Sequence, residues 1–152
     1  MNEIERALSF FRPQDESTPK LNCSQAVLAA FSDRLGLDPE TARELARGFG
    51  GGIGRHGLTC GAVTGAVMAL GCAGRHLNDE EKAKAHVQEL VREFFRRFEA
   101  RHGATDGRDL LSADLSTAEG YQTAREQKLF DGNCPGFVKD AAEIVDDLLI
   151  RE

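Results

Sequence analysis

Hydrophobic side chains recur along most of this chain at the three- and four-residue spacing of an α-helix. The segment 22–35 is an example, because Ala26, Val27, Ala30 and Phe31 form one apolar stripe along it. No segment alternates between apolar and polar residues as a half-buried strand would, and no internal repeat or low-complexity tract is present. The pattern therefore predicts an all-α fold.

Local signals for helix ends divide the chain further. Asp38 and Pro39, for instance, form a cap followed by a first-turn proline, whereas 103–114 is expected to be a loop. The expected helices run over about 4–11, 22–35, 39–47, 58–75, 79–102, 116–130 and 135–150. We expect a compact single-domain bundle of about five to seven helices over residues 1–152, in which 1–19 form a peripheral helix and linker.

The segment 58–75 is apolar on nearly all sides, which is typical of the central helix of a bundle. It contains Gly61 and Gly65, four positions apart, and alanines continue the same ridge of small residues. A glycine inside a helix costs about 1 kcal/mol relative to alanine. We therefore expect the backbone of a neighbouring helix, or a ligand, to approach this helix very closely.

The composition is that of an ordinary globular protein, with 41% hydrophobic and 29% charged residues and a net charge of −6. Nucleic acid is not an expected partner, because Lys and Arg form no run that could neutralise phosphates. No apolar run reaches the roughly 18 residues of a membrane span. The first residues are acidic where a secretory signal would be basic, so we expect a cytoplasmic protein.

Three of the four cysteines, Cys23, Cys60 and Cys134, fall where a helix is expected to begin. The unpaired N–H groups and the positive dipole end of a helix start stabilise a thiolate and lower its pKa. In a reducing compartment, cysteines are more typical of metal ligation or transient redox chemistry than of structural disulfides. We therefore predict that these three form one site, as redox thiols or as metal ligands. The alternative is that three small residues simply fill helix ends.

Cys72 is set apart from this predicted site by geometry. It follows Cys60 by twelve positions, which places it about 18 Å further along an unbroken helix and about 120° around it. Two sulfurs that far apart cannot share one metal ion or form a disulfide. We expect Cys72 to be a core residue.

The glycine-rich loop 48–57 lies between two expected helices and lacks the Gly-Lys-Ser/Thr ending of a phosphate-binding P-loop. Its successive N–H groups could still form a nest for an anion, such as a thiolate or the sulfide of a cluster. We therefore assign a cofactor-binding role to Gly50, Gly51 and Gly52 in the loop and to Gly61 after it. His56 precedes Cys60 by four positions and could supply a nitrogen ligand or a general base.

The glycine-rich loop, the segment Thr59-Cys60-Gly61-Ala62-Val63-Thr64-Gly65 and the earlier Asn22-Cys23-Ser24-Gln25 together carry a resemblance to a known family. Over about residues 20 to 150 the chain resembles the C_GCAxxG_C_C family, whose name describes a Cys-Gly-Ala-x-x-Gly motif and further cysteines. The resemblance places Cys23, Cys60 and Cys134 on family cysteines, and it implies a redox or metal-related role in which an iron–sulfur centre is plausible. Gly107 stands where the remaining family cysteine would be.

Three interpretations of function stay open, and whether the chain is an enzyme is open with them. In the first, the three cysteines bind an iron–sulfur cluster or a metal ion such as iron or zinc, with His56, water or the second subunit of a homodimer completing the shell. In the second, two thiols cycle between dithiol and disulfide with an unknown redox partner. In the third, the chain is a non-redox interaction domain with structural cysteines. The absence of a Cys-x-x-Cys pair slightly favours ligation.

Overall fold

The computed structural model describes residues 1–150 and, within them, confirms the all-α prediction. The only β-type pairing in this range is an isolated antiparallel bridge between Thr59 and Asp106. The elements are α1 (Glu3–Phe11), α2 (Cys23–Ala30), α3 (Ser32–Leu35), α4 (Pro39–Ala46), the 3-10 helix η1 (Arg47–Phe49), α5 (Gly61–Cys72), the 3-10 helix η2 (Ala73–His76), α6 (Glu80–His102), α7 (Gly107–Leu111), α8 (Ala118–Glu126) and α9 (Leu129–Ile150).

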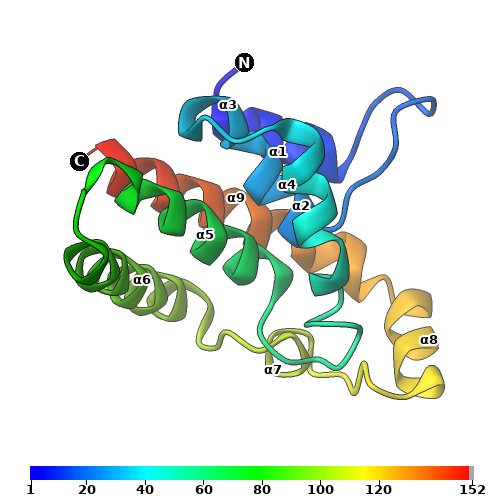
Figure 1. Cartoon of the computed structure of the whole chain (residues 1–152). Helices are drawn as coiled ribbons and strands as arrows, with labels where there is room; N and C mark the ends of the chain where they lie inside the picture. Colours follow the sequence, from blue (N-terminus) through cyan, green and yellow to red (C-terminus); the bar gives the residue numbers. More distant parts are fainter. Residues whose placement is uncertain (151–152) are drawn as a thin grey trace.

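The most apolar helix, α5, lies in the middle of the bundle, as its sequence predicts. It packs against α2, α6 and α9, and α1 covers the other side of α2 and α9 (Figure 1). Seven of its side chains or glycines are buried: Gly61, Ala62, Val63, Gly65, Ala66, Ala69 and Leu70. The helix is shorter than the expected 58–75, because Thr59 is extended in its bridge to Asp106 and a 3-10 turn follows Cys72.

The glycines of α5 allow α2 to approach it at backbone distance, as expected. A Cβ atom on Gly65 would lie 2.6 Å from the carbonyl oxygen of Ser24, which is closer than atoms can approach. A Cβ atom on Gly61 would lie 3.1 Å from the Cβ of Cys23. The helix that begins at Cys23 can therefore pack closely against the helix that begins just after Cys60, because Gly61 and Gly65 have no side chains.

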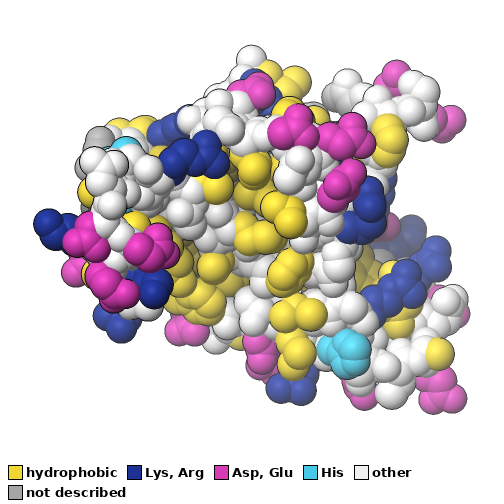
Figure 2. Space-filling model, in the orientation of Figure 1, with side chains coloured by type: hydrophobic (Ala, Val, Ile, Leu, Met, Phe, Trp, Pro, Cys, Tyr) yellow, Lys and Arg dark blue, Asp and Glu magenta, His cyan; other side chains and the backbone are white. Residues whose placement is uncertain are grey.

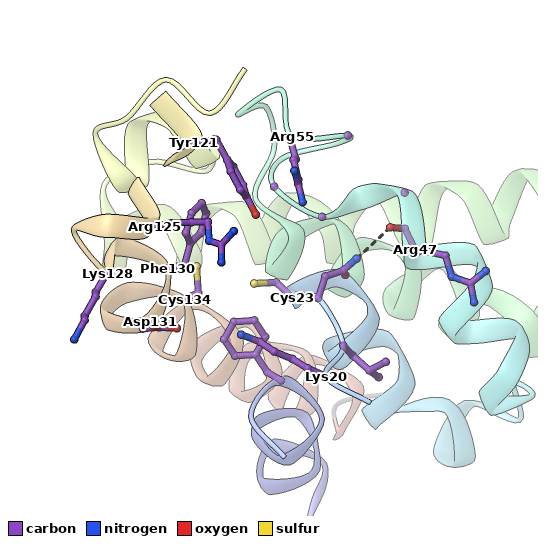
Figure 3. A pocket seen from close by; sticks show the side chains of 17 residues that line it. Lys20, Cys23, Arg47, Arg55, Tyr121, Arg125, Lys128, Phe130, Asp131 and Cys134 are labelled. Carbon is purple, nitrogen blue, oxygen red and sulfur yellow. Dashed lines mark hydrogen bonds between the residues drawn. The ribbon is translucent and has the colours of Figure 1, made fainter. Parts of the chain in front are cut away.

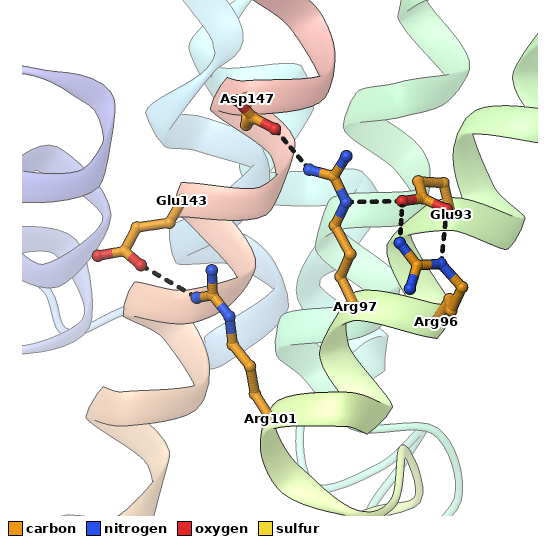
Figure 4. A network of polar contacts seen from close by, with 6 residues as sticks. All are labelled: Glu93, Arg96, Arg97, Arg101, Glu143 and Asp147. Carbon is orange, nitrogen blue, oxygen red and sulfur yellow. Dashed lines mark hydrogen bonds and ion pairs between the residues drawn. The ribbon is translucent and has the colours of Figure 1, made fainter.

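The long helix α6 is fixed to α9 by arginine–carboxylate pairs (Figure 4). Arg97 pairs with Glu93 on its own helix and with Asp147 on α9. One turn later, Arg101 lies 3.0 Å from Glu143. Hydrogen bonds from Arg96 and Arg97 hold the pKa of the Glu93 carboxyl at about 2. These pairs orient α9, which carries Cys134.

Two short helices were not expected from the sequence. Phe31 leaves helical geometry, so the predicted helix over 22–35 is divided into α2 and α3. The predicted loop 103–114 contains α7, a single turn that follows the bridge at Asp106. With these turns, residues 1–150 contain nine α-helices, more than the five to seven expected.

The prediction that Cys134 lies at a helix start is wrong. Lys128, in the left-handed region with φ 57°, separates α8 from α9, and α9 begins at Leu129. Pro135 is therefore inside the helix, where it lacks the N–H that would donate to the carbonyl of Asp131. The guanidinium of Arg12, at the end of α1, donates to that carbonyl instead. A contact with α1 thus allows the helix to continue through the proline.

Hydrophobic side chains form a band on the face of the molecule seen in Figure 2, between clusters of charged side chains on either side. Leu45, Ile53 and Leu58 are the large apolar side chains most exposed in the middle of the chain. None of the helices in residues 1–150 combines the length and the apolar character needed to span a membrane. The predicted homodimer remains a prediction.

Candidate functional site

The structure brings three of the four cysteines together. Cys23 on α2 and Cys134 on α9 lie close enough for each thiol to shift the pKa of the other, and Cys60 is close enough to interact electrostatically with both. Figure 3 shows the sulfur atoms of Cys23 and Cys134 directed toward one another. Cys72 lies at the opposite end of α5 from Cys60 and is half-buried there. The predicted trio is therefore a spatial cluster, and within it two thiols form a pair.

A capping box fixes Cys23 as the first residue of α2. The side chain of Asn22 accepts from the N–H of Gln25, and the side chain of Gln25 accepts from the N–H of Asn22. The same two side chains also reach outward, because Asn22 donates to the carbonyl of Arg47 and Gln25 donates to that of Arg43. The start of α2 is thereby tied to α4 and η1, which leaves Cys23 little freedom to move.

Cys60 lies on the buried side of the cysteine cluster. It is 6% exposed and precedes the first residue of α5, and its N–H donates to the carbonyl of Thr105. Burial raises the pKa of its thiol to about 12, although hydrogen bonds from the N–H groups of Ala62 and Val63 act in the opposite direction. The predicted lowering at a helix start is therefore wrong for Cys60, because desolvation outweighs the helix terminus.

The two facing thiols, Cys23 and Cys134, differ in their pKa shifts. The pKa of Cys134 is lowered, first by the hydrogen bond from Cys23 and then by the charges of Lys20 and Arg12. The pKa of Cys23 is raised well above its usual value by the same hydrogen bond and by burial. The first proton to leave the pair therefore leaves a thiolate on Cys134, which the S–H of Cys23 stabilises.

A cavity of about 950 Å³ opens in front of this pair, and both sulfurs belong to its wall. Its other walls come from the start of α2, the glycine-rich loop, and the turn between α8 and α9 (Figure 3). The lining residues are Phe11, Lys20, Leu21, Asn22, Cys23, Arg47, Gly48, Gly50, Gly51, Gly54, Arg55, Tyr121, Arg125, Lys128, Phe130, Asp131 and Cys134. The volume is that of a small-molecule site.

The glycine-rich loop forms a left-handed turn. Every residue from Gly51 to Arg55 has a positive φ, including the non-glycine residues Ile53 and Arg55 at 63° and 64°. The loop closes on itself, because the N–H groups of Ile53, Gly54 and Arg55 donate to carbonyls of the residues just before it. These three N–H groups are committed within the loop, so any anion nest must use other donors.

The glycines predicted to bind a cofactor occupy different places. Gly50 and Gly51 line the cavity, whereas Gly52 packs against the backbone of Leu58. Gly61 lies behind Cys23 and allows it to sit against α5. Two of the four thus face the space where a ligand could lie, and the other two shape its walls.

Arg55 and Tyr121 form a stacked pair that the sequence did not indicate. The guanidinium carbon of Arg55 lies 4.2 Å from the centre of the Tyr121 ring, and that ring contacts Phe130 at 5.3 Å between centroids. Such a contact fixes the orientation of the guanidinium over the cavity. The partners come from a loop and from α8, so no spacing in the sequence predicts their meeting.

The lining carries an excess of positive charge. Five cationic side chains contribute to it: Lys20, Arg47, Arg55, Arg125 and Lys128. Asp131 is the single carboxylate of the lining, and it lies 3.7 Å from Arg12. The absence of a basic run in the sequence did not predict this surface, because the five cations are spread over more than a hundred positions.

His56 is exposed, and its Nδ1 lies 3.0 Å from the carbonyl oxygen of Ile53. It lines a separate, smaller hollow on the other side of Arg55 and not the cavity of the cysteine pair. The structure therefore does not bring His56 to the three cysteines, and its predicted role as a ligand or base receives no support from its position.

The residues present do not fit a metal ion or an iron–sulfur cluster within one chain. In the described range 1–150, no three His, Cys, Asp or Glu side chains are grouped so that they could hold a metal. Cys60 does not line the cavity onto which Cys23 and Cys134 open. Gly107, at the expected fourth position, donates its N–H to the carbonyl of Leu58.

Comparison with known proteins gives one result. Residues 21–148 match the model of the family described as "Putative redox-active protein (C_GCAxxG_C_C)". The search of curated proteins and the search of solved structures both return no match. The match covers most of the chain and includes Cys23, Cys60, Cys134 and the glycine-rich loop. The chain therefore belongs to the C_GCAxxG_C_C family.

Proposed function

We propose that this chain is a thiol–disulfide redox protein in which Cys23 and Cys134 are the working pair. The observation that carries the proposal is that the sulfur atoms of Cys23 and Cys134 point toward one another at the wall of an open cavity (Figure 3). Two thiols that face one another from neighbouring helices are placed to form a disulfide. The family's redox description supports the same chemistry.

The reaction runs in two exchange steps. In the first, the thiolate of Cys134 attacks one sulfur of a substrate disulfide, forms a mixed disulfide, and releases the other substrate sulfur as a thiolate that takes up a proton. In the second, Cys23 loses its proton and attacks the Cys134 sulfur of the mixed disulfide, which releases the second substrate thiol. The substrate disulfide is thereby reduced to two thiols, and the protein dithiol is oxidised to a Cys23–Cys134 disulfide.

The assignment of Cys134 as the attacking residue rests on its surroundings. Lys20 and Arg12 contribute positive charge near it, and Cys23 donates its S–H. Cys23 is then already adjacent for the second step. Cys60 has no role in the exchange, because its buried thiol stays protonated at neutral pH. A reducing compartment, such as the cytoplasm that the sequence predicts, would keep the pair in its dithiol form.

Thiol counting with matched variants tests the proposal. The purified, reduced protein is treated with a small disulfide oxidant, and free thiols are then tagged with a maleimide and located by peptide mass mapping. We expect the wild-type protein and Cys72→Ser to lose two thiols each, as one intramolecular disulfide between residues 23 and 134. Cys23→Ser is expected to stop at the mixed disulfide on Cys134, and Cys134→Ser to form no internal disulfide.

Two outcomes would contradict this function. Four thiols that stay free under oxidant would support structural cysteines. Stoichiometric iron, zinc or acid-labile sulfide in anaerobically purified protein, lost in Cys23→Ser, Cys60→Ser and Cys134→Ser, would support the metal interpretation that the family resemblance raised.

A further inference from the structure

We propose that the cavity beside the Cys23–Cys134 pair binds a small disulfide that carries at least two negative charges, and that this anion is the substrate of the pair. The inference rests on the proposed thiol–disulfide function, because it names the chemical class that the pair acts on. Three observations support it: the charge of the cavity wall, the direction of its cations, and its size.

The charge of the wall is opposite to that of the whole molecule. The chain has a net charge of −6, yet the cavity is lined by five cations and one carboxylate. That carboxylate, Asp131, already lies near Arg12. Several cations elsewhere are paired, for example Arg34 with Asp146 at 2.6 Å. Among residues 1–150, no ion pair is formed by any of the five lining cations. Like charges gathered without partners repel one another, and an anionic ligand removes that repulsion.

The cations lie on both sides of the sulfur pair (Figure 3). Arg55 and Arg125 point toward the cavity on the side of Tyr121, whereas Arg47 and Lys128 point outward at its rim. On the opposite side, the Lys20 ammonium lies over the ring of Phe11, 5.2 Å from its centroid. A disulfide placed against the sulfurs would therefore extend an anionic group toward the arginines and another toward the lysine. Guanidinium groups bind carboxylates and phosphates by paired hydrogen bonds.

Arg55 is held in place before any ligand arrives. Its φ of 64° and the φ of 63° at Ile53 are unfavourable for side chains with a Cβ atom. The stacking on Tyr121, at 4.2 Å, and the hydrogen bonds within the loop maintain this conformation. Strained backbone of this kind is typical of positions where a side chain must be presented in one orientation.

The size of the cavity sets the size of the ligand. A volume of about 950 Å³ is at the upper end of small-molecule sites. The cavity is large enough for a disulfide with two short charged arms, and its position between α2 and α9 gives such a molecule direct access to both sulfurs.

A series of disulfides with the same S–S bond and different charge tests the inference. The probes are 3,3′-dithiodipropionate with two negative charges, 2-hydroxyethyl disulfide without charge, and cystamine with two positive charges. Oxidation of the protein is followed by thiol loss, and each rate is divided by the rate of the same probe with dithiothreitol. We expect the normalised rates to fall in that order, by about tenfold per step at low ionic strength, and to converge at high salt.

Matched variants locate the effect. Arg55→Gln and Arg125→Gln are each expected to reduce the ratio between the anionic and the neutral probe about three- to tenfold. Arg92→Gln removes an exposed cation of α6 that does not line the cavity, and it is expected to keep the wild-type ratio. A ratio that does not change in the two cavity variants would overturn the assignment.

Tyrosine fluorescence measures binding without any redox step. Tyr121 is the only tyrosine and the chain has no tryptophan, so the emission reports on this wall of the cavity and on the adjoining hollow that shares Tyr121. Suberate has the length and charge of dithiodipropionate but no sulfur, and 1,8-diaminooctane is its cationic counterpart. We expect a saturable change with suberate, lost in Arg55→Gln, and none with the diamine. Inorganic pyrophosphate is titrated in the same way, and the tighter anion identifies carboxylate or phosphate as the preferred group.

The two proposals fail in different ways. If suberate binds but no probe oxidises the pair, the thiol–disulfide function is wrong while the anion site remains. If all three disulfides react at equal normalised rates and neither suberate nor pyrophosphate changes the emission, the anionic substrate is wrong while the redox function remains.

Discussion

Cys60 and Cys134 belong to the same cluster and are equally exposed, at 6% each, yet their surroundings are opposite. Cys60 lies where α2 and α5 touch through the glycines of α5, and its thiol is removed from solvent. Cys134 faces a cavity with Lys20 and Arg12 in its vicinity and an S–H donor beside it. Burial raises the pKa of Cys60 to about 12, whereas the neighbours of Cys134 lower its pKa.

This difference shows that a helix terminus is a poor guide to thiol reactivity. Cys60 stands at a helix start and stays protonated, whereas Cys134 lies inside a helix and is the thiol that ionises first. Desolvation and specific neighbours therefore decide the ionisation here, and the helix terminus contributes less. Gly65→Ala and Cys60→Ala act on the buried side of this comparison, Lys20→Gln acts on the charged side, and Gly107→Cys adds a thiol outside both.

The burial of Cys60 depends on the close packing of α2 and α5 at Gly65. A methyl group there would overlap the carbonyl oxygen of Ser24, so we expect Gly65→Ala to lower the free energy of unfolding by about 3 kcal/mol and to make Cys60 accessible to maleimide. Urea unfolding and labelling rates measure both effects. Gly71→Ala on the same helix is the control, because nothing lies within 4 Å of the added atom, and it should be neutral or stabilise by up to about 1 kcal/mol. Equal effects of the two substitutions would show that the close approach of α2 is not needed.

Cys60→Ala removes the buried thiol itself. We expect a loss of about 1–2 kcal/mol at neutral pH from the lost packing. Because the folded pKa is about 12 and the ordinary value is 9.0, the unfolded chain releases this proton first. The stability that Cys60 provides is thus present below about pH 9 and is lost as the pH rises toward 12.

Urea midpoints between pH 7 and 11 check this dependence. The wild-type protein should lose stability steeply at alkaline pH, and Cys60→Ala should lose less. Cys72→Ala, at the other end of α5, should follow the wild-type slope. If Cys60→Ala keeps the full alkaline slope, Cys60 is not the group responsible.

The charged side is tested by Lys20→Gln. The Lys20 charge helps to lower the pKa of Cys134, so its removal raises that pKa. We expect the rate of iodoacetamide modification of Cys134 at neutral pH to fall about two- to threefold, since the lysine is exposed and its charge is screened. Lys82→Gln on α6 serves as the charge-matched control. An unchanged pH profile in Lys20→Gln would assign the reactivity to Cys23 and Arg12 alone.

The smallest effect is expected from Gly107→Cys, which places a thiol at the family's remaining cysteine position. The nearest atoms to the added Cβ are at 3.5 Å or more, so the stability should change by less than about 1 kcal/mol. Residue 107 pairs with Leu58 across the bridge and not with Cys60, so we expect no gain in metal content. Stoichiometric iron or zinc in this variant would show that the site is one cysteine short of a metal centre.

The sequence was sufficient to predict features that depend on residues close together in the chain. The start of α4 follows from Asp38 and Pro39, and the central place of α5 follows from its apolar surface. The clustering of Cys23, Cys60 and Cys134 was also anticipated. The start of α9 was not, because Arg12, more than a hundred positions away, stabilises the helix through Pro135. The cationic wall was missed for the same reason, since its residues meet only in the folded chain.

The long separation between Cys23 and Cys134 also has a consequence for the synthesis of this protein. A nascent chain has made α2 and α5 well before the last helix emerges, so the thiol pair is one of the final contacts to form. Until then Cys23 has no S–H acceptor at residue 134. Thiolate reactivity at residue 134 therefore marks a chain whose folding is finished, and its appearance during refolding reports the arrival of α9.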